Sequence, residues 1–444
     1  KRLRLTLTEM RATTEVEASM IAEAVRLAVL ERPDVVLMDL RMPVLVGVAA
    51  TARLRADVPD AAVLVLTTYA DDESILAALR AGARVTDLEF VQFHPTVLFL
   101  GEGSTGQQPL ISEAVRGEGG RLLNGDGERF MERYAPTIVD LAPRDIVARS
   151  MVLEVLEGRG AGPNKDYVYI DVRHLGEDVL EAKLPDITEF ARTYLGVDPV
   201  HEPVPVMPTA HYAMGGIPTN TDAEVLKDNT TVIPGLYAAG ECACVSVHGS
   251  NRLGTNSLLD INVFGKRAGI AAVDYAKKAK HVPVPADAAD EVIAMVEKVR
   301  NSKGTEKVAV LRKELQDTMD KNAQVYRTEE SLNEALEKIA ELRVRYENIS
   351  VQDKGQRFNT DLLEAIELGF LLDLAEVLAF TSRERRESRG GHFREDYETR
   401  DDKKFMVHSM AYLTDKKAKK PGDNIKLDWK PVVITNYQPM ERKY

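Results

Sequence analysis

One long segment of this chain, residues 288–382, is charged, poor in glycine and marked by apolar residues at a helical period. Its apolar positions include Leu332, Leu336, Ile339, Leu342 and Val344. Residues three or four positions apart lie on one face of an α-helix, where they pack against neighbouring helices. The segment is therefore predicted to fold as a small antiparallel helical domain.

The chain ahead of this segment mixes short apolar runs with turns, which is typical of an α/β protein. Val35–Asp39 and Ala62–Leu66 are predicted to form buried parallel strands. From residue 87 to about residue 205, glycine-rich turns separate short β segments, and Asn124–Gly127 predicts a hairpin. The next elements expected are a strand over residues 231–239 and a helix over residues 257–278.

The composition is typical of a soluble multidomain protein, since 444 residues correspond to about three domains of roughly 150 residues. Apolar residues make up 44%, and a net charge of −12 argues against nucleic acid, whose partners need a basic face. The apolar runs fall well short of the roughly 18 residues of a membrane helix. Cys242 and Cys244 stand too close for a disulfide framework, and no cleavable signal is evident, so a cytoplasmic location is expected.

The segment 22–84 resembles the receiver domain of bacterial response regulators. Asp39 ends one apolar run and Thr67 ends the next, as expected of a phosphoacceptor strand and its neighbour. Phosphoryl transfer in that family also needs an acidic pair to hold Mg²⁺ and a lysine on the last strand. Neither stands at the expected place, so we do not expect Asp39 to accept phosphate.

A glycine pattern at Gly101–Gly106 fits GxGxxG after a short apolar run, which alone would predict a dinucleotide site. Its context opposes this interpretation. Glu102 would bring a carboxylate toward the pyrophosphate, and Pro109 would disrupt the helix that has to follow. A loop is expected instead.

Several motifs follow residue 87 in a fixed order. They are EFVQFHPT at 89–96, SEAVRGEGG at 112–120, PRD at 143–145, PTAHYAMGG at 208–216, AGE at 239–241 and HGSNRLGTNSLL at 248–259. Over residues 87–444 the series resembles the flavoprotein subunits of the succinate dehydrogenase and fumarate reductase family. The resemblance implies an α/β and α+β multidomain fold: an incomplete FAD-binding-type α/β domain, an α+β capping domain, an antiparallel helical domain and an irregular C-terminal domain.

The resemblance also sets the domain boundaries that we expect. They are 1–86 for the receiver-like segment in place of the N-terminal FAD-binding half, 87–205 for the capping and substrate domain, 206–282 for the C-terminal part of the FAD-binding domain, 283–385 for the helical domain and 386–444 for the C-terminal domain.

Four polar residues are expected to bind the carboxylates of a C4 dicarboxylate. By resemblance they are His94, Ser112, His211 and Arg252, with Ser112 at a position where many relatives have threonine. Guanidinium groups suit this task because they bind carboxylates bidentately. Each histidine alone could equally be a structural hydrogen-bonding residue, and Arg252 a satisfied core arginine.

Arg144 matches the proton-shuttling arginine of the family, and Glu113 and Arg116 match its relay to solvent. An arginine base is unusual, because a guanidinium stays protonated in most settings. A relay through Glu113 in a dry cationic pocket would make it workable. The alternative is that Arg144 forms a simple ion pair with Asp145 at a helix start.

Flavin contacts are implied for Glu241, Asn256, Ser257 and Leu258. A helix beginning near Ser257 would direct its positive end at the flavin and stabilise negative charge on it. The alternative is an ordinary helix capped by Asn256 or Ser257. Residues 242–244 lack the spacing of a zinc site, so these cysteines are expected to pack in the core.

The implied activity is FAD-dependent oxidation of succinate to fumarate by a succinate dehydrogenase (quinone)-type enzyme. Electrons would pass to an iron–sulfur subunit, membrane anchor subunits and quinone, since this chain has too few cysteines to hold clusters. The resemblance places such a subunit peripherally on the inner face of the bacterial plasma membrane.

Two features of the family are not found ahead of Asp87, namely the glycine fingerprint for the FAD pyrophosphate and the histidine that can bind FAD covalently. We therefore expect weak flavin binding, or a composite or truncated chain without activity. The insert over residues 97–111 is closer to L-aspartate oxidase, an alternative that the helical domain and the tail oppose. A receiver domain with a fused partner and a non-catalytic scaffold are the remaining alternatives.

Overall fold

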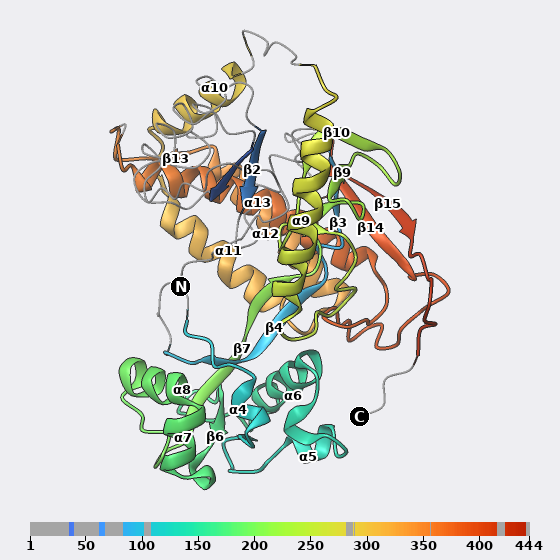
Figure 1. Cartoon of the computed structure of the whole chain (residues 1–444). Coiled ribbons are helices and arrows are strands. Elements are labelled where there is room, and N and C mark those ends of the chain that lie inside the picture. The colour runs from blue at the N-terminus through green and yellow to red at the C-terminus, as the bar shows by residue number, and fades with distance from the viewer. Residues whose placement is uncertain are drawn as a thin grey trace.

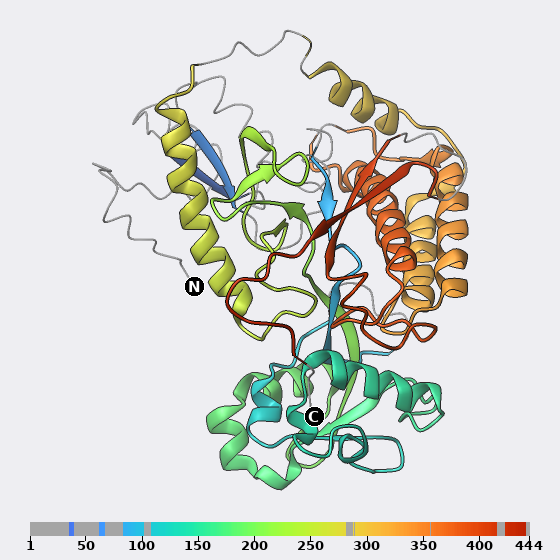
Figure 2. The same ribbon diagram turned by 90° about the vertical axis from the view of Figure 1, so that its right-hand side faces the viewer.

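The computed structural model describes residues 35–39, 62–66, 83–101, 108–280, 287, 289–355, 357–414 and 422–440. They form a larger and a smaller lobe (Figure 1). Two long paired strands, β4 (Val91–Leu98) and β7 (Val204–Ala213), run from one lobe into the other. The smaller lobe is built from the chain between these strands, as the second view also shows (Figure 2).

The smaller lobe is organised by a four-stranded antiparallel sheet in the order β4-β7-β6-β5. Its shorter strands are β5 (Arg121–Leu123) and β6 (Val168–Asp171). Its helices are α4 (Ala114–Gly117), α5 (Met131–Tyr134), α6 (Arg144–Leu156), α7 (Glu177–Lys183) and α8 (Pro185–Phe190), with single turns at Val139–Leu141, Arg173–Leu175 and Ala191–Leu195. The core includes Leu98, Ile111, Leu122, Phe130 and Val206, all fully buried.

The larger lobe contains several small sheets and a long helix, α9 (Asn256–Ala276). Its strands are β3 (Val85–Thr86), β8 (Ile217–Pro218), β9 (Glu224–Leu226), β10 (Val232–Tyr237), β11 (Ala243–Cys244), β12 (Glu306–Lys307), β13 (Ile349–Ser350), β14 (Val407–Leu413) and β15 (Ile425–Pro431). β10 and α9 confirm the strand and the helix expected over 231–239 and 257–278. Cys242 and Cys244 are buried thiols, which confirms that they pack in the core.

Helices α10 (Asp290–Arg300), α11 (Val308–Asn322), α12 (Glu329–Tyr346) and α13 (Thr360–Glu384) form the helical unit (Figure 2). Ion pairs between α11 and α12 join the end of one helix to the start of the other, since Glu314 pairs with Arg345 and Lys321 with Glu334. These helices are therefore antiparallel, as predicted.

The buried face of α12 follows the predicted period, with one exception. Leu332, Leu336, Ile339 and Leu342 are at most 1% exposed, whereas Val344 is 68% exposed. Positions two apart lie on nearly opposite sides of a helix of 3.6 residues per turn. Val344 therefore faces solvent and is not a core position.

The hairpin predicted at Asn124–Gly127 is wrong. β5 pairs with β6, and the chain after the turn enters α5. The side chain of Asn124 accepts hydrogen bonds from the backbone N–H groups of Asp126 and Glu128, which closes a local turn of a different kind. Its amide also donates to Glu154 of α6, so the turn is fixed by a helix rather than by a second strand.

Some sequence predictions concern residues outside the described ranges. Within residues 22–82 of the receiver-like segment only β1 (Val35–Asp39) and β2 (Ala62–Leu66) are described, and they pair in parallel as predicted. Residues 102–106 of the predicted loop also lie outside the described residues. Among the helices that are described, none combines the length and apolar character needed to cross a membrane.

Candidate active site

The candidate site lies where β4 and β7 meet the loop before α9. Gln92 and His94 come from β4, and His211 comes from β7. Antiparallel pairing brings the two histidines together, with ring centroids 5.2 Å apart at an angle of 75°. Arg252 reaches this point from the loop, so residues far apart in sequence converge on one place.

Arg144, Glu113 and Arg116 form a continuous hydrogen-bonded chain. Arg144, the first residue of α6, donates through Nε and Nη2 to the two carboxylate oxygens of Glu113 at 2.9 and 3.0 Å. Arg116 donates through Nη2 to Glu113 Oε1 at 3.0 Å and through Nη1 to the carbonyl oxygens of Asp140 and Ala142. Arg144 therefore has a carboxylate partner in Glu113, a residue other than the Asp145 of the helix-start alternative.

Electrostatics keep Glu113 ionised between these arginines. Burial opposes its charge, but the hydrogen bonds and positive charge of Arg144, together with Arg116, hold the pKa of Glu113 below its usual value. Burial lowers the pKa of Arg116 against the attraction of Glu113. The side chain of Arg116 is 4% exposed and that of Glu113 is 36% exposed, so the carboxylate of Glu113 is more accessible to solvent than the guanidinium of Arg116.

Both histidines are neutral hydrogen-bonding groups. Burial and then the positive charge of Arg144 lower the pKa of His94 to about 2. The backbone N–H of Thr96 donates to His94 Nδ1, so the ring proton is on Nε2, which is buried and has no partner among the described residues. His211 is the more exposed ring, and removal from bulk water followed by the charge of Arg144 lowers its pKa to about 4.

Arg252 is a buried cation held on three sides. Its Nη2 donates to His211 Nε2 at 3.1 Å, and its Nη1 donates to Ser257 Oγ at 3.2 Å. The guanidinium lies 4.2 Å from the centroid of the Tyr212 ring, a cation–π contact. Burial and then Arg144 lower its pKa.

Gly254 closes the backbone over the Arg144–Glu113 pair. A Cβ atom at this position would lie 2.5 Å from Glu113 Oε2 and 3.7 Å from Arg144 Nη2. The first distance is shorter than any van der Waals contact, so a Cβ atom at this position would displace the Glu113 carboxylate.

Two family profiles and several relatives match this chain. A profile described as an FAD binding domain matches residues 39–258, and one described as the fumarate reductase flavoprotein C-term matches residues 312–444. The solved structure of an E. coli quinol fumarate reductase superposes with a TM-score of 0.77 and 37% identity, and the match covers 86% of this chain and 67% of that one. This chain belongs to the succinate dehydrogenase and fumarate reductase flavoprotein family.

Curated members of this flavoprotein family are similar over most of the chain. The succinate dehydrogenase flavoprotein subunit of Rickettsia bellii is 48% identical over 363 residues, which cover 81% of this chain and 59% of that protein. The mitochondrial subunit of Oryza sativa is 44% identical and is covered to 60%. This chain thus spans about three-fifths of the length of the curated relatives. The FAD binding profile begins at residue 39, so it includes part of the receiver-like segment.

The remaining predicted residues of this flavoprotein lie near the same place but differ in their contacts. Ser112 precedes Glu113, and its exposed hydroxyl accepts from the backbone N–H of Ala114. Glu241 accepts from the backbone N–H of Ala213 at 3.2 Å, and burial raises its pKa to about 7. Ser112 therefore lies at the start of α4, which carries Arg116, and Glu241 lies beside β7, which carries His211.

The start of α9 differs from the capped helix offered as an alternative. Thr255 is its N-cap residue, and α9 shows no side-chain cap. Asn256 is the first helical residue, and the Ser257 hydroxyl accepts from Arg252 instead of from the backbone. The ordinary capping interpretation is therefore wrong. Leu258 extends outward and is 59% exposed.

Sequence reasoning missed several polar residues that hold the site together. Gln92 accepts from Arg144 Nη1 through Oε1 at 2.9 Å. Tyr212 and Asp260 both contact Nε2 of His248, each at 3.2 Å, beneath Arg252. Gln92 stands two positions before His94 on one strand, and this spacing was an available signal because such positions share a face.

Proposed function

We propose that this chain is the flavoprotein subunit of a succinate dehydrogenase and oxidises succinate to fumarate with FAD. The pairing of Arg144 with Glu113, beside a set of cationic and neutral donors, carries this proposal. Family membership supports it, and so do relatives named as succinate dehydrogenase flavoprotein subunits.

Arg252, His211 and His94 bind the carboxylates of the substrate. Arg252 offers the formal charge. Its buried Nε has no hydrogen-bond partner in the described part of the chain, and it marks a direction in which a ligand oxygen would accept. His94 offers its Nε2 proton in the same way. Because both histidines are neutral, they add hydrogen bonds without repelling the arginines. Ser112 is proposed to join them through its exposed hydroxyl.

Arg144 receives the proton that leaves the substrate carbon. The proton arrives at a terminal nitrogen of the guanidinium as another proton moves along a hydrogen bond to Glu113. Glu113 passes it on toward solvent, with Arg116 holding the carboxylate in place. Arg144 thus returns to its starting charge, which removes the objection that a free guanidinium is a poor base.

The residues near α9 fit a flavin. FAD, when bound, supplies the two-electron acceptor for the hydride of the substrate. The uncapped start of α9 would face its negative edge, and Glu241, Asn256, Ser257 and Leu258 would hold it. The exposed side chains of Leu258 and Leu259, 59% and 61% exposed, provide apolar surface for a ring system.

The proposal extends to partners, location and domains. The electrons would leave through an iron–sulfur subunit and membrane anchor subunits, with the complex on the inner face of a bacterial plasma membrane. The boundaries at residues 86, 205, 282 and 385 are proposed to separate the units of the subunit. The receiver-like identity of residues 22–84 stays a sequence-based prediction.

Steady-state oxidation tests the activity directly. The chain is supplied with excess FAD and an artificial electron acceptor, and its turnover of succinate is compared with that of L-aspartate. We expect succinate to be oxidised, and Arg144→Lys to abolish turnover while substrate binding persists. Preferential oxidation of aspartate would favour the oxidase, the alternative raised by the insert over 97–111. Absence of both reactions would refute the proposal.

A further inference from the structure

The side-chain amide of Gln92 has a fixed orientation. Its Nε2 donates to Asn251 Oδ1 at 2.8 Å and to the carbonyl oxygen of Arg252 at 2.6 Å. Its Oε1 is therefore left for Arg144 Nη1, at 2.9 Å. If the amide were flipped, its NH₂ group would face the N–H groups of Arg144, a contact between donors that repel each other. Whatever orients this amide also orients Arg144.

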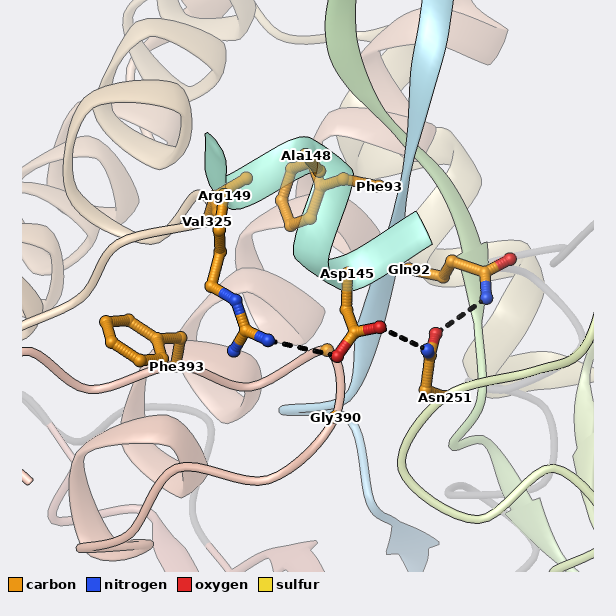
Figure 3. A pocket seen from close by; sticks show the side chains of 10 residues that line it. Gln92, Phe93, Asp145, Ala148, Arg149, Asn251, Val325, Gly390 and Phe393 are labelled. Atoms are coloured by element: carbon orange, nitrogen blue, oxygen red, sulfur yellow. Dashed lines mark hydrogen bonds and ion pairs between the residues drawn. The ribbon is translucent and has the colours of Figure 1, made fainter. Parts of the chain in front are cut away.

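Asn251 continues the chain of hydrogen bonds from Gln92 to Asp145 (Figure 3). Its Nδ2 donates to Asp145 Oδ1 at 2.8 Å, and Arg149 donates to Asp145 Oδ2 at 3.1 Å. A carboxylate only accepts, so Asp145 selects the NH₂ side of Asn251. Asn251 must then present its oxygen to Gln92. The direction of each bond is thus set by the ion pair of Asp145 with Arg149.

The network is buried and joins the two lobes. The side chain of Asp145 is 4% exposed, and Gln92 is 1% exposed. Asp145 and Arg149 belong to α6 of the smaller lobe, whereas Asn251 belongs to the loop before α9 in the larger one. Hydrogen bonds shielded from water are stronger and restrict orientation more firmly. A change at Asn251 should therefore reach Arg144.

We propose that Asn251 is a positioning residue that, together with Asp145, orients Gln92 so that its carbonyl oxygen holds Arg144 ready to receive the substrate proton. The inference rests on the proposed function for the role of Arg144, but the predicted geometry of Arg144 does not depend on turnover. Asn251 touches neither substrate nor flavin in this proposal and acts only through Gln92.

A swap of donor and acceptor tests the proposal. Asn251→Asp places two carboxylates against each other, so the bond to Asp145 is lost. In the double variant Asn251→Asp with Asp145→Asn, the introduced amide donates to the introduced carboxylate and still accepts from Arg149, while Gln92 keeps its acceptor. The proposal predicts that the double variant recovers what the single variant loses.

The first readout is the Nη1–H signal of Arg144, which belongs to the group that Gln92 holds, in a ¹⁵N-arginine NMR spectrum of the full chain, assigned by its loss in Arg144→Lys. Asn251→Asp should speed the exchange of this proton with water by about tenfold, and the double variant should restore it to within about threefold. The second readout is succinate turnover, in which Asn251→Asp should lower kcat by about tenfold or more and change KM little.

The outcomes separate this proposal from the proposed function. A wild-type chain without succinate turnover refutes the function, and the NMR comparison still decides whether Asn251 positions Arg144. Unchanged exchange in Asn251→Asp, or no recovery in a double variant that melts like the wild type, overturns the positioning role. If Asn251→Asp does not fold, Asn251→Ser applies the same NMR test, because its shorter side chain cannot reach both Gln92 and Asp145.

Discussion

Substituting Gly254 by alanine should damage catalysis while leaving the fold intact. A Cβ atom there would lie 2.5 Å from Glu113 Oε2, and the nearest atom belongs to the far end of a flexible side chain. Glu113 can therefore swing aside at little cost in folding free energy. In doing so it loses at least one of its hydrogen bonds to Arg144, which measure 2.9 and 3.0 Å.

The expected magnitude follows from the strength of that bond. A hydrogen bond to a charged group contributes about 1.5–3 kcal/mol, which corresponds to roughly 10- to 150-fold in rate if it is needed in the transition state. We expect kcat for succinate to fall by this factor in Gly254→Ala, with a free energy of unfolding within about 1 kcal/mol of the wild type.

The assay combines succinate oxidation in the presence of FAD with denaturant unfolding. Gly265→Ala is the matched control, because Gly265 lies in α9 and no atom of the described residues is within 4 Å of the added Cβ. It should keep full activity and gain slight stability from the helix propensity of alanine. Full activity in Gly254→Ala would refute the role assigned to the Glu113–Arg144 pair. An activity loss that merely follows unfolding would refute the prediction that the fold stays intact.

Three further predictions follow from burial and charge. His94→Ala should raise the KM for succinate by about 2- to 10-fold, which corresponds to the loss of one neutral hydrogen bond. Because burial and Arg144 lower the pKa of His94 to about 2, the ratio of the variant's KM to the wild-type KM should not change between about pH 5 and pH 8. A KM ratio that varies over this range would contradict a neutral His94. Burial raises the pKa of Glu241 from 4.5 to about 7, so the folded state binds more protons than the unfolded state between these pH values. The wild type therefore loses stability as the pH rises through this window. Glu241→Gln should gain stability relative to the wild type between about pH 5 and pH 8, measured by urea unfolding. A difference that shrinks with rising pH would be inconsistent with this sign. Leu336→Ala should cost about 2–5 kcal/mol of unfolding free energy and Val344→Ala at most about 0.5 kcal/mol, since the side chains are 1% and 68% exposed; similar losses would disprove the assigned helix face.

The helical unit and the site residues could be foreseen from sequence for different reasons. Burial of one face of α12 follows directly from the spacing of Leu332, Leu336, Ile339 and Leu342, a local property. Arg144 and Glu113 were predicted as site residues from their motifs. Their hydrogen bonds form because the fold brings these two motifs together. Their roles remain proposals, as do those of the four carboxylate-binding residues.

Other features depended on contacts that no local pattern encodes. The role of Gln92 follows from the orientation of its amide, which is set by residues about 160 positions later in the chain. The local sequence at Asn124 predicts a hairpin, but the side chain of Asn124 donates a hydrogen bond to Glu154 of α6. Similarly, the local sequence predicts Ser257 as a helix cap, but its hydroxyl accepts a hydrogen bond from Arg252. In each case a distant partner decides between two locally acceptable structures.

The most direct measurement is the visible absorption spectrum of the chain with bound FAD before and after addition of succinate, without oxygen or any other electron acceptor. We predict that succinate bleaches the oxidised flavin in the wild type and leaves it oxidised in Arg144→Lys. A wild-type flavin that stays oxidised with succinate but is bleached by dithionite would contradict succinate oxidation at this site.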